Sequence, residues 1–281
     1  MVGLGYFAQV AVLPAFKRAK GVELAALVSD DATKLKELGK EYDVPLLATY
    51  DSYDDLLASG TIDAVYVCLP NDLHEEFTVR AAAHKVHVLC EKPLAVTSEE
   101  CRRMVDACRR NRVRLMTAYR LHFNAANLEA ARIANEDIGR PRYITGSFSM
   151  QVKPGIRTRG EDRGGGPLHD IGIYCINAAR YLFREEPLWA QAAAGTGQRQ
   201  ARFKAIDEQV TCILGFSEGK TASFTVSYGA ADVACYTVVG TKGLVCLDNA
   251  YEHSTSMTLE TCILPSRSII PPCWVRRLGR I

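Results

Sequence analysis

The first residues suited to ligand chemistry are the glycines of Gly3-x-Gly5-x-x-Ala8, at the start of the chain. A dinucleotide-binding turn needs Gly3 for the tight strand-to-helix turn, Gly5 for close approach of the backbone to a pyrophosphate, and a small residue such as Ala8 for helix–sheet packing. The free N–H groups at the start of the next helix would bind the phosphates. Taken alone the pattern also fits an ordinary turn. Followed by an apolar strand at 23–28, it predicts a nucleotide site.

The residues that end this strand bear on the choice between NAD and NADP. An acidic residue here binds the ribose hydroxyls and would repel a 2′-phosphate. The strand ends in Ser29, whose hydroxyl can hydrogen-bond a phosphate, and Lys34 in the next helix can supply positive charge. Asp30 could instead rotate into the ribose position, and Lys34 could be a solvated helix residue. The charge argument favours NADP over NAD.

Lys92 is the charged side chain that is placed best for chemistry on a ligand. It lies in the run Leu89-Cys90-Glu91-Lys92-Pro93, at the carboxyl end of an apolar strand, where doubly wound sheets bind their ligands. Because the proline restricts the chain beside it, the ammonium can be directed into the crevice. A plain charge pair at the edge of the sheet is the alternative interpretation.

The elements that must position these residues alternate regularly over the first 120 residues. Apolar strands are expected at 23–28, 64–68, 86–90 and 114–118. Helices are expected to begin near Asp51 or Ser52, near Asn71, and at Thr97 or Ser98, where Thr97-x-x-Glu100 fits a capping box. Apolar strands separated by helices predict a parallel sheet covered on both faces. We therefore expect an α/β fold with an N-terminal doubly wound parallel sheet of the Rossmann type.

The pattern changes near residue 121. Alternating strands are expected at 142–152, 205–216, 221–228, 235–240 and 244–247, with one helix at about 167–183. Closely spaced strands joined by short glycine-containing turns predict an antiparallel sheet. The expected domains are therefore 1–121, which binds the nucleotide, and 122–281, an α+β domain with a large open antiparallel sheet.

Composition excludes several classes of protein. The chain is 48% hydrophobic and 23% charged, as in ordinary globular proteins. Its 34 basic and 32 acidic residues are too balanced for a protein that binds nucleic acid through its phosphates. No apolar run approaches the roughly 18 residues of a membrane span. The 10 cysteines are scattered, without zinc spacing, so we expect reduced thiols, no metal site and a cytoplasmic location.

Five segments together resemble the Gfo/Idh/MocA oxidoreductase family, and within it the glucose–fructose oxidoreductase branch. They are Gly3–Ala8, Leu69-Pro70-Asn71 with His74, Glu91-Lys92-Pro93, Tyr119-Arg120-Leu121-His122, and Gly164-Gly165-Gly166-Pro167-Leu168-x-Asp170-x-Gly172-x-Tyr174. The resemblance implies a Rossmann domain followed by a mixed domain with an open antiparallel sheet. Together with the charge argument for NADP, it implies an NADP-dependent oxidoreductase that acts on a sugar, polyol or related carbohydrate and assembles as a homodimer or homotetramer.

The resemblance implies that Lys92, Asp170 and Tyr174 are the catalytic residues. A hydride would pass directly between a carbinol carbon and C4 of the nicotinamide. Tyr174 would exchange the hydroxyl proton, while the ammonium of Lys92 favours the phenolate and polarises the developing carbonyl. Asp170 would orient the sugar hydroxyls or Lys92, and its spacing from Tyr174 puts both on one helix face. A buried helix aromatic is the alternative interpretation of Tyr174.

The expected cofactor contacts follow the same motifs. They are Gly3, Gly5, Tyr6, Phe7, Ala8, Ser29, Lys34, Leu69, Pro70, Asn71, His74, Glu91, Lys92 and Arg120. By analogy with the family, Asn71 would line the nicotinamide pocket, with His74 near it at the start of a helix. Arg120 and His122 could contact substrate or act as structural hydrogen-bonding groups. Arg157 and Arg159 could reach substrate or a cofactor phosphate.

The two ends of the chain depart from the family pattern. Only Met1 and Val2 precede Gly3, whereas a typical strand has about five residues, so we expect a shortened first strand. The stretch 261–281 has four arginines, no acidic residue and no clear periodicity. A catalytically inactive or truncated nucleotide-binding relative is therefore the alternative to an active enzyme.

Overall fold

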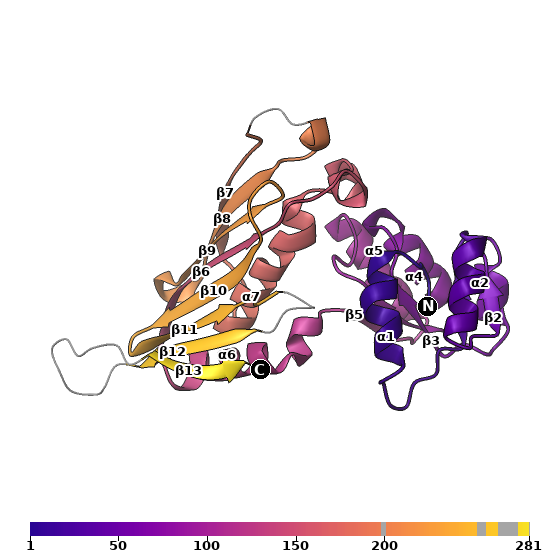
Figure 1. Ribbon diagram of the computed structural model, residues 1–281, viewed down its shortest axis with the longest axis horizontal. Helices are drawn as coiled ribbons and strands as arrows, with labels where there is room; N and C mark the ends of the chain where they lie inside the picture. Colours follow the sequence, from indigo (N-terminus) through magenta and orange to yellow (C-terminus); the bar gives the residue numbers. More distant parts are fainter. Residues whose placement is uncertain (198–200, 252–256, 264–274, 281) are drawn as a thin grey trace. The chain divides into compact units, whose positions relative to one another are not determined.

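The computed structural model describes residues 1–197, 201–251, 257–263 and 275–280, and only the backbone of the last range. The chain forms two compact units, Met1–Tyr119 (unit 1) and Arg120–Ile281 (unit 2). Figure 1 colours unit 1 from indigo to purple and unit 2 from magenta to yellow. None of the helices in the described ranges has the length and hydropathy of a membrane span.

Unit 1 is built on short parallel strands. β1 (Ala26–Val28) pairs with β2 (Leu46–Ala48), and a second set has the order β3 (Ala64–Val67), β4 (His87–Cys90), β5 (Leu115–Thr117). The apolar runs expected at 23–28, 64–68, 86–90 and 114–118 each contain one of these strands. β2 was not expected, because three residues are too few to show a hydrophobic pattern.

The start of the chain lies between these two sets of strands. Val2 forms parallel bridges to both Val28 and Val67 and is fully buried. Its N–H donates to the carbonyl of Tyr66 at 2.8 Å, and its own carbonyl accepts the N–H of Cys68 at 2.8 Å. This short segment therefore takes the central position of a doubly wound sheet and joins β1 to β3.

The helices of unit 1 follow the strands in the expected alternation. They are α1 (Leu13–Phe16, after the π-helical turn η1, Ala8–Val12), α2 (Ala32–Glu41), α3 (Tyr53–Ala58), α4 (His74–Ala83, after the 3-10 turn η2, Asn71–Leu73) and α5 (Ser98–Arg110). The expected capping box is confirmed: Thr97 Oγ1 accepts the N–H of Glu100, whose carboxylate accepts the N–H of Thr97.

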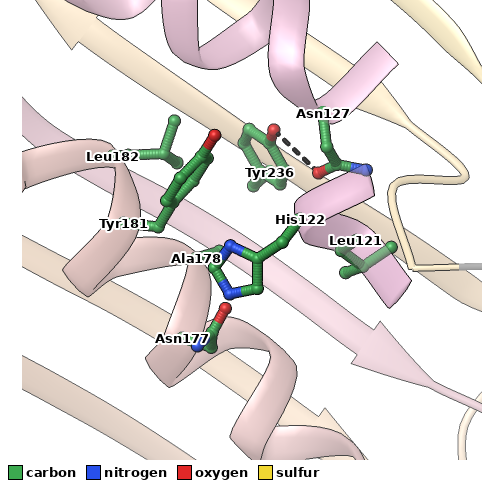
Figure 2. A pocket seen from close by; sticks show the side chains of 8 residues that line it. All are labelled: Leu121, His122, Asn127, Asn177, Ala178, Tyr181, Leu182 and Tyr236. Atoms are coloured by element: carbon green, nitrogen blue, oxygen red, sulfur yellow. Dashed lines mark hydrogen bonds between the residues drawn. The ribbon is translucent and has the colours of Figure 1, made fainter. Parts of the chain in front are cut away.

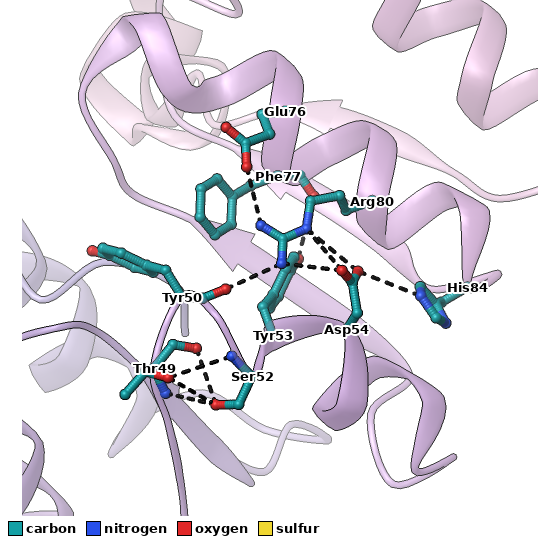
Figure 3. A network of polar contacts seen from close by, with 9 residues as sticks. All are labelled: Thr49, Tyr50, Ser52, Tyr53, Asp54, Glu76, Phe77, Arg80 and His84. Carbon is teal, nitrogen blue, oxygen red and sulfur yellow. Dashed lines mark hydrogen bonds and ion pairs between the residues drawn. The ribbon is translucent and has the colours of Figure 1, made fainter.

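A polar network fixes the loop between β2 and α3 against α4 (Figure 3). The guanidinium of Arg80, on α4, donates to Asp54 at 3.3 Å, to Glu76 at 3.0 Å and to the carbonyl of Tyr50 at 3.1 Å. Desolvation opposes the charge of Arg80, but its two carboxylate partners raise its pKa overall. The network holds Tyr50, whose N–H in turn binds Asp30 beside the expected nucleotide site.

Unit 2 contains an eight-stranded sheet in the part that the structure describes. Its order is β13 (Val275–Arg280), β12 (Thr258–Ile263), β11 (Gly243–Asp248), β10 (Val233–Gly240), β6 (Pro141–Ser149), β9 (Thr221–Ser227), β8 (Gln209–Gly215) and β7 (Trp189–Gly195). All neighbours are antiparallel except β6 and β9, which run parallel. These two strands are far apart in the chain, so no hairpin constrains their direction.

Two helices, α6 (Ala125–Glu136) and α7 (Ile173–Phe183), cover one face of this sheet (Figure 1). The opposite face carries exposed side chains such as Tyr143, Ile213 and Val233. The expected α/β Rossmann-type unit followed by an α+β unit with a large open, mostly antiparallel sheet is thus confirmed. The lack of periodicity in 261–281 was misleading, because β12 and β13 lie within 258–280.

Substitutions at the two glycines of the first turn should have different effects. Gly3 has φ +90°, and a Cβ there would clash with the carbonyl oxygen of Cys68. In Gly3→Ala the positive φ alone destabilises the folded state by about 1–3 kcal/mol, and the clash adds to this cost. We therefore expect Gly3→Ala to lower Tm by roughly 4 °C or more.

Gly5 differs, because a Cβ at this position meets no atom within 4 Å outside its chain neighbours. Gly5→Ala should therefore keep the wild-type Tm and weaken cofactor binding. Thermal melts and NADPH titration would check both, and a wild-type melt for Gly3→Ala would contradict the turn geometry.

Candidate active site

The turn after the first bridge is open to an anion. The N–H of Gly3 donates to the carbonyl of Val28 at 2.9 Å, which fixes the turn. Ala8 is fully buried at the start of η1, whereas Tyr6 is 79% exposed and the space above Gly5 is free. The backbone at Gly5 is therefore accessible to an anion such as a phosphate, and the neighbouring Tyr6 side chain is exposed.

Ser29 and Lys34 both contact Asp31, which follows the strand and for which the sequence predicted no role. Ser29 is 5% exposed, and its Oγ accepts the N–H of Asp31 at 3.2 Å. Lys34 Nζ lies 2.8 Å from Asp31 Oδ2, while Asp31 Oδ1 accepts the N–H of Lys34 and caps α2. These contacts with Lys34 lower the pKa of the Asp31 carboxyl. Asp30 accepts the N–H of Tyr50 at 2.9 Å, so its carboxylate already has a partner.

The segment that carries Lys92 is fixed by a buried carboxylate. Glu91 is 9% exposed, and its Oε2 accepts the N–H of Lys92 at 3.1 Å. Its Oε1 accepts the hydroxyl of Tyr66 at 2.6 Å. Burial, and then the charge of Glu91, raise the pKa of the Tyr66 phenol, so this hydroxyl stays protonated as a donor. The Glu91 side chain thus contacts both the backbone of Lys92 and the hydroxyl of Tyr66.

His74 connects this segment to the loop after β3. The side chain is fully buried; Nδ1 lies 2.9 Å from the carbonyl oxygen of Pro93, and Nε2 lies 2.9 Å from that of Leu69. Asn71 and Pro70, also expected cofactor contacts, lie on the same loop and are partly exposed. Unit 1 therefore brings together the predicted residues at the ends of β3 and β4.

Asp170 lies in the π-helical turn η6 (Leu168–Gly172), which leads into α7. Its Oδ2 accepts the hydroxyl of Tyr228 at 2.8 Å and lies 2.9 Å from Nε of Arg157. Tyr228 is fully buried, and burial together with the Asp170 charge raises its pKa. π-Helical turns are frequent at functional sites. Tyr228 was missed because no motif marks a residue 58 positions further along the chain.

Tyr174 lies on the first turn of α7, in an aromatic cluster. Its ring stacks on Tyr251, with centroids 5.9 Å apart, and lies 5.8 Å from that of Phe148. Tyr174 is partly buried, not enclosed. The guanidinium of Arg120, an expected cofactor contact, donates to the carbonyl of Tyr251. Arg120 therefore supports the backbone beneath the Tyr174 ring within unit 2.

His122 lines a small cavity of unit 2 (Figure 2). Its volume is about 10 Å³, and the hydroxyl of Tyr236 donates to Asn127 on its wall at 3.2 Å. The His122 ring packs edge-on against Tyr181, with centroids 4.9 Å apart. A cavity of this size holds about one water molecule, so it is too small for a sugar. In the described ranges, no three His, Cys, Asp or Glu side chains gather as metal ligands would.

The fold and the glycine turn are those of a dinucleotide-binding enzyme, and similar proteins make it an NAD(P)-dependent oxidoreductase that acts on CH–OH groups. Residues 1–119 match a family model described as "Oxidoreductase family, NAD-binding Rossmann fold", and residues 130–246 match the GFO/IDH/MocA C-terminal domain. The chain belongs to the Gfo/Idh/MocA oxidoreductase family, as the motifs indicated.

Characterised relatives and solved structures agree with this assignment. The chain is 32% identical over 235 residues to a D-xylose 1-dehydrogenase (NADP(+)) of Haloferax volcanii, covering 83% of this chain and 70% of that protein. The crystal structure of aldose-aldose oxidoreductase from Caulobacter crescentus, complexed with glycerol, has a TM-score of 0.92 at 33% identity, covering 99% and 82%. A 3-ketoreductase from Actinomadura kijaniata, in complex with NADP and TDP-benzene, has a TM-score of 0.83 at 25% identity, covering 99% and 83%.

Proposed function

We propose that this enzyme transfers a hydride between NADP and a hydroxyl-bearing carbon of a sugar, polyol or related carbohydrate, with NAD the less favoured cofactor. Relatives named as an NADP-dependent xylose dehydrogenase and an aldose-aldose oxidoreductase support the substrate class. The observation that carries the proposal is the environment of Asp170. This carboxylate is largely buried, and Tyr228 and Arg157 hold it on the turn that leads to Tyr174. It can therefore accept hydrogen bonds from substrate hydroxyls at a fixed position.

Lys92, Asp170 and Tyr174 are the proposed catalytic residues. When bound, NADP supplies the nicotinamide C4 that accepts the hydride in the oxidising direction. Tyr174, as the phenolate, takes the proton of the substrate hydroxyl as the C–H bond breaks and the carbonyl forms. The Lys92 ammonium stabilises the negative charge of this phenolate and the charge that develops on the substrate oxygen. Asp170 accepts hydrogen bonds from neighbouring substrate hydroxyls or orients Lys92.

The nucleotide turn supports NADP as the cofactor. The free space above Gly5 gives the pyrophosphate access to the backbone. Ser29, where an acidic residue would favour NAD, is neutral, and Lys34 follows one turn into α2. Because Lys34 pairs with Asp31 at 2.8 Å, a 2′-phosphate must compete with this carboxylate for the ammonium. The preference for NADP is therefore expected to be moderate.

Asp31→Asn should strengthen that preference. The amide still caps α2, since asparagine is as good an N-cap as aspartate, but it no longer neutralises Lys34 or repels a phosphate. We expect the Kd for NADPH to fall by about 3- to 10-fold, with the Kd for NADH unchanged. Ser29→Asp should do the reverse and favour NADH. Equal changes for both cofactors in Asp31→Asn, measured by nucleotide fluorescence, would assign Asp31 to helix stability alone.

A direct assay tests the proposed function. The purified chain is incubated with NADP⁺ and a panel of aldoses and polyols, D-xylose included, and NADPH formation is followed by absorbance. Turnover of at least one sugar, faster with NADP⁺ than with NAD⁺, is the expected result. Tight NADPH binding without turnover of any member would favour the alternative, an inactive nucleotide-binding relative.

We also propose that the chain forms a homodimer or homotetramer through the open face of its sheet. That face exposes Tyr143, Ile213 and Val233, opposite the helix-covered side. Light scattering after size exclusion would test this, and Tyr143→Glu should shift the protein towards monomer. The cytoplasmic location stays a prediction from the cysteine usage of the sequence.

A further inference from the structure

The imidazole of His74 lies between two segments that the proposed chemistry depends on. It is the first residue of α4 and is fully buried. Nδ1 faces the carbonyl oxygen of Pro93, the residue after Lys92, and Nε2 faces that of Leu69, at the start of the loop that carries Asn71. Both distances are 2.9 Å, which is the ordinary length of an N–H···O hydrogen bond.

The backbone at Lys92 is thus held on both sides. On one side the Lys92 N–H donates to the buried Glu91 carboxylate, itself bound by the hydroxyl of Tyr66. On the other side the Pro93 carbonyl faces His74. Since a lysine side chain is a flexible four-carbon stem, the position of its ammonium depends on a fixed backbone beneath it.

We propose that His74 is a positioning residue, which places the Lys92 ammonium by anchoring the Pro93 carbonyl to the start of α4. The proposal rests on the catalytic role proposed for Lys92. Burial lowers the pKa of His74 against the opposing effect of its hydrogen bonds, so the ring is neutral near pH 7. A neutral ring donates through one nitrogen only, and the proposal requires that this nitrogen is Nδ1.

Three substitutions separate the two contacts of the ring. The amide of His74→Asn reaches the position of Nδ1 and can still donate to Pro93. The longer His74→Gln reaches the position of Nε2 and can donate to Leu69. His74→Leu removes both contacts while keeping an apolar side chain of similar size. His84→Asn, at the C-terminal end of the same helix, is the matched control, since this histidine contacts Asp54 and neither segment.

The readout is the pH profile of kcat for sugar oxidation, together with the Kd for NADPH. In His74→Leu we expect kcat to fall by about 10-fold or more, and the pH of half-maximal kcat to rise by about one unit, because a displaced ammonium no longer favours the phenolate of Tyr174. NADPH affinity should fall less than kcat does. His74→Asn should restore most of the activity and the profile, His74→Gln should not, and His84→Asn should match wild type.

Two results would overturn the inference. One is a wild-type pH profile in His74→Leu with a uniformly lower rate, which indicates loss of folded enzyme alone. The other is better rescue by His74→Gln than by His74→Asn, which assigns the important bond to Leu69. If His74→Leu does not fold, the comparison of His74→Asn with His74→Gln tests the inference.

Lys92→Met in the same assay distinguishes the catalytic role of Lys92 from the positioning role of His74. If Lys92→Met leaves the pH profile unchanged, the proposed role of Lys92 itself is wrong.

Discussion

Tyr174→Phe is expected to lower kcat by about 100-fold or more, because proton transfer by a positioned side chain contributes at least that much to such reactions. The phenyl ring keeps the stacking on Tyr251 and the contact with Phe148, so only the hydroxyl is lost. NADPH affinity and Tm should therefore change little. Steady-state kinetics and a cofactor titration on the same preparation would measure both.

Tyr181→Phe is the matched control for that substitution. Tyr181 lies on the same helix, is also partly buried, and packs edge-on against His122 through its ring. We expect its kcat to stay within about threefold of wild type, since its hydroxyl has no proposed part in proton transfer. Near-normal turnover in Tyr174→Phe would remove Tyr174 from the mechanism and return it to the role of a helix aromatic.

Lys92→Met should have an effect of similar or larger size. The thioether fills much of the same volume without the charge, so stabilisation of the developing oxyanion is lost, at a cost of about 100- to 1000-fold in kcat. The remaining activity should need a higher pH, by about one unit or more, because no cation favours the phenolate. NADPH binding should weaken far less than kcat.

Lys40→Met controls for the loss of one positive charge. Lys40 is an exposed residue in the last turn of α2, and its replacement should leave both kcat and its pH dependence as in wild type. The role of Lys92 would be contradicted if its substitution raised KM alone, because that pattern indicates uniform binding of ground state and transition state.

Much of the fold follows from local sequence signals. The strands β3 and β4 were predicted because three of the four residues in each are apolar and at least partly buried, so that they form short apolar runs. β7 was missed because every residue of Trp189–Gly195 is exposed, which removes the alternation that marks a strand. α6 was missed because it buries mainly small residues such as Ala126, Ala130 and Ala134, whose hydrophobic signal is weak.

In the candidate site, too, local motifs could be predicted from the sequence and tertiary contacts could not. Motifs marked the proposed catalytic residues Lys92, Asp170 and Tyr174, because each motif is a local run of residues. The partners that hold these segments come from tertiary contacts: His74 reaches across 19 residues to Pro93, and Tyr228 across 58 residues to Asp170. No periodicity or short motif records such pairs. The pairing of Asp31 with Lys34, by contrast, spans three residues and could have been predicted from the helix start.

The strand β6, in the middle of the large sheet, is synthesised well before both of the strands that pair with it. β6 pairs on one side with β9, where Tyr143 lies opposite Thr221, and on the other with β10, where Tyr143 lies opposite Val239. During synthesis both edges of β6 stay open until these later strands leave the ribosome, and closing such long loops carries a large entropic cost. Unit 1, by contrast, has all its strands when residue 119 has emerged. Unit 2 therefore completes its folding late, and in the interval the exposed edges of β6 are where a nascent chain is open to chaperones or to wrong strand pairing.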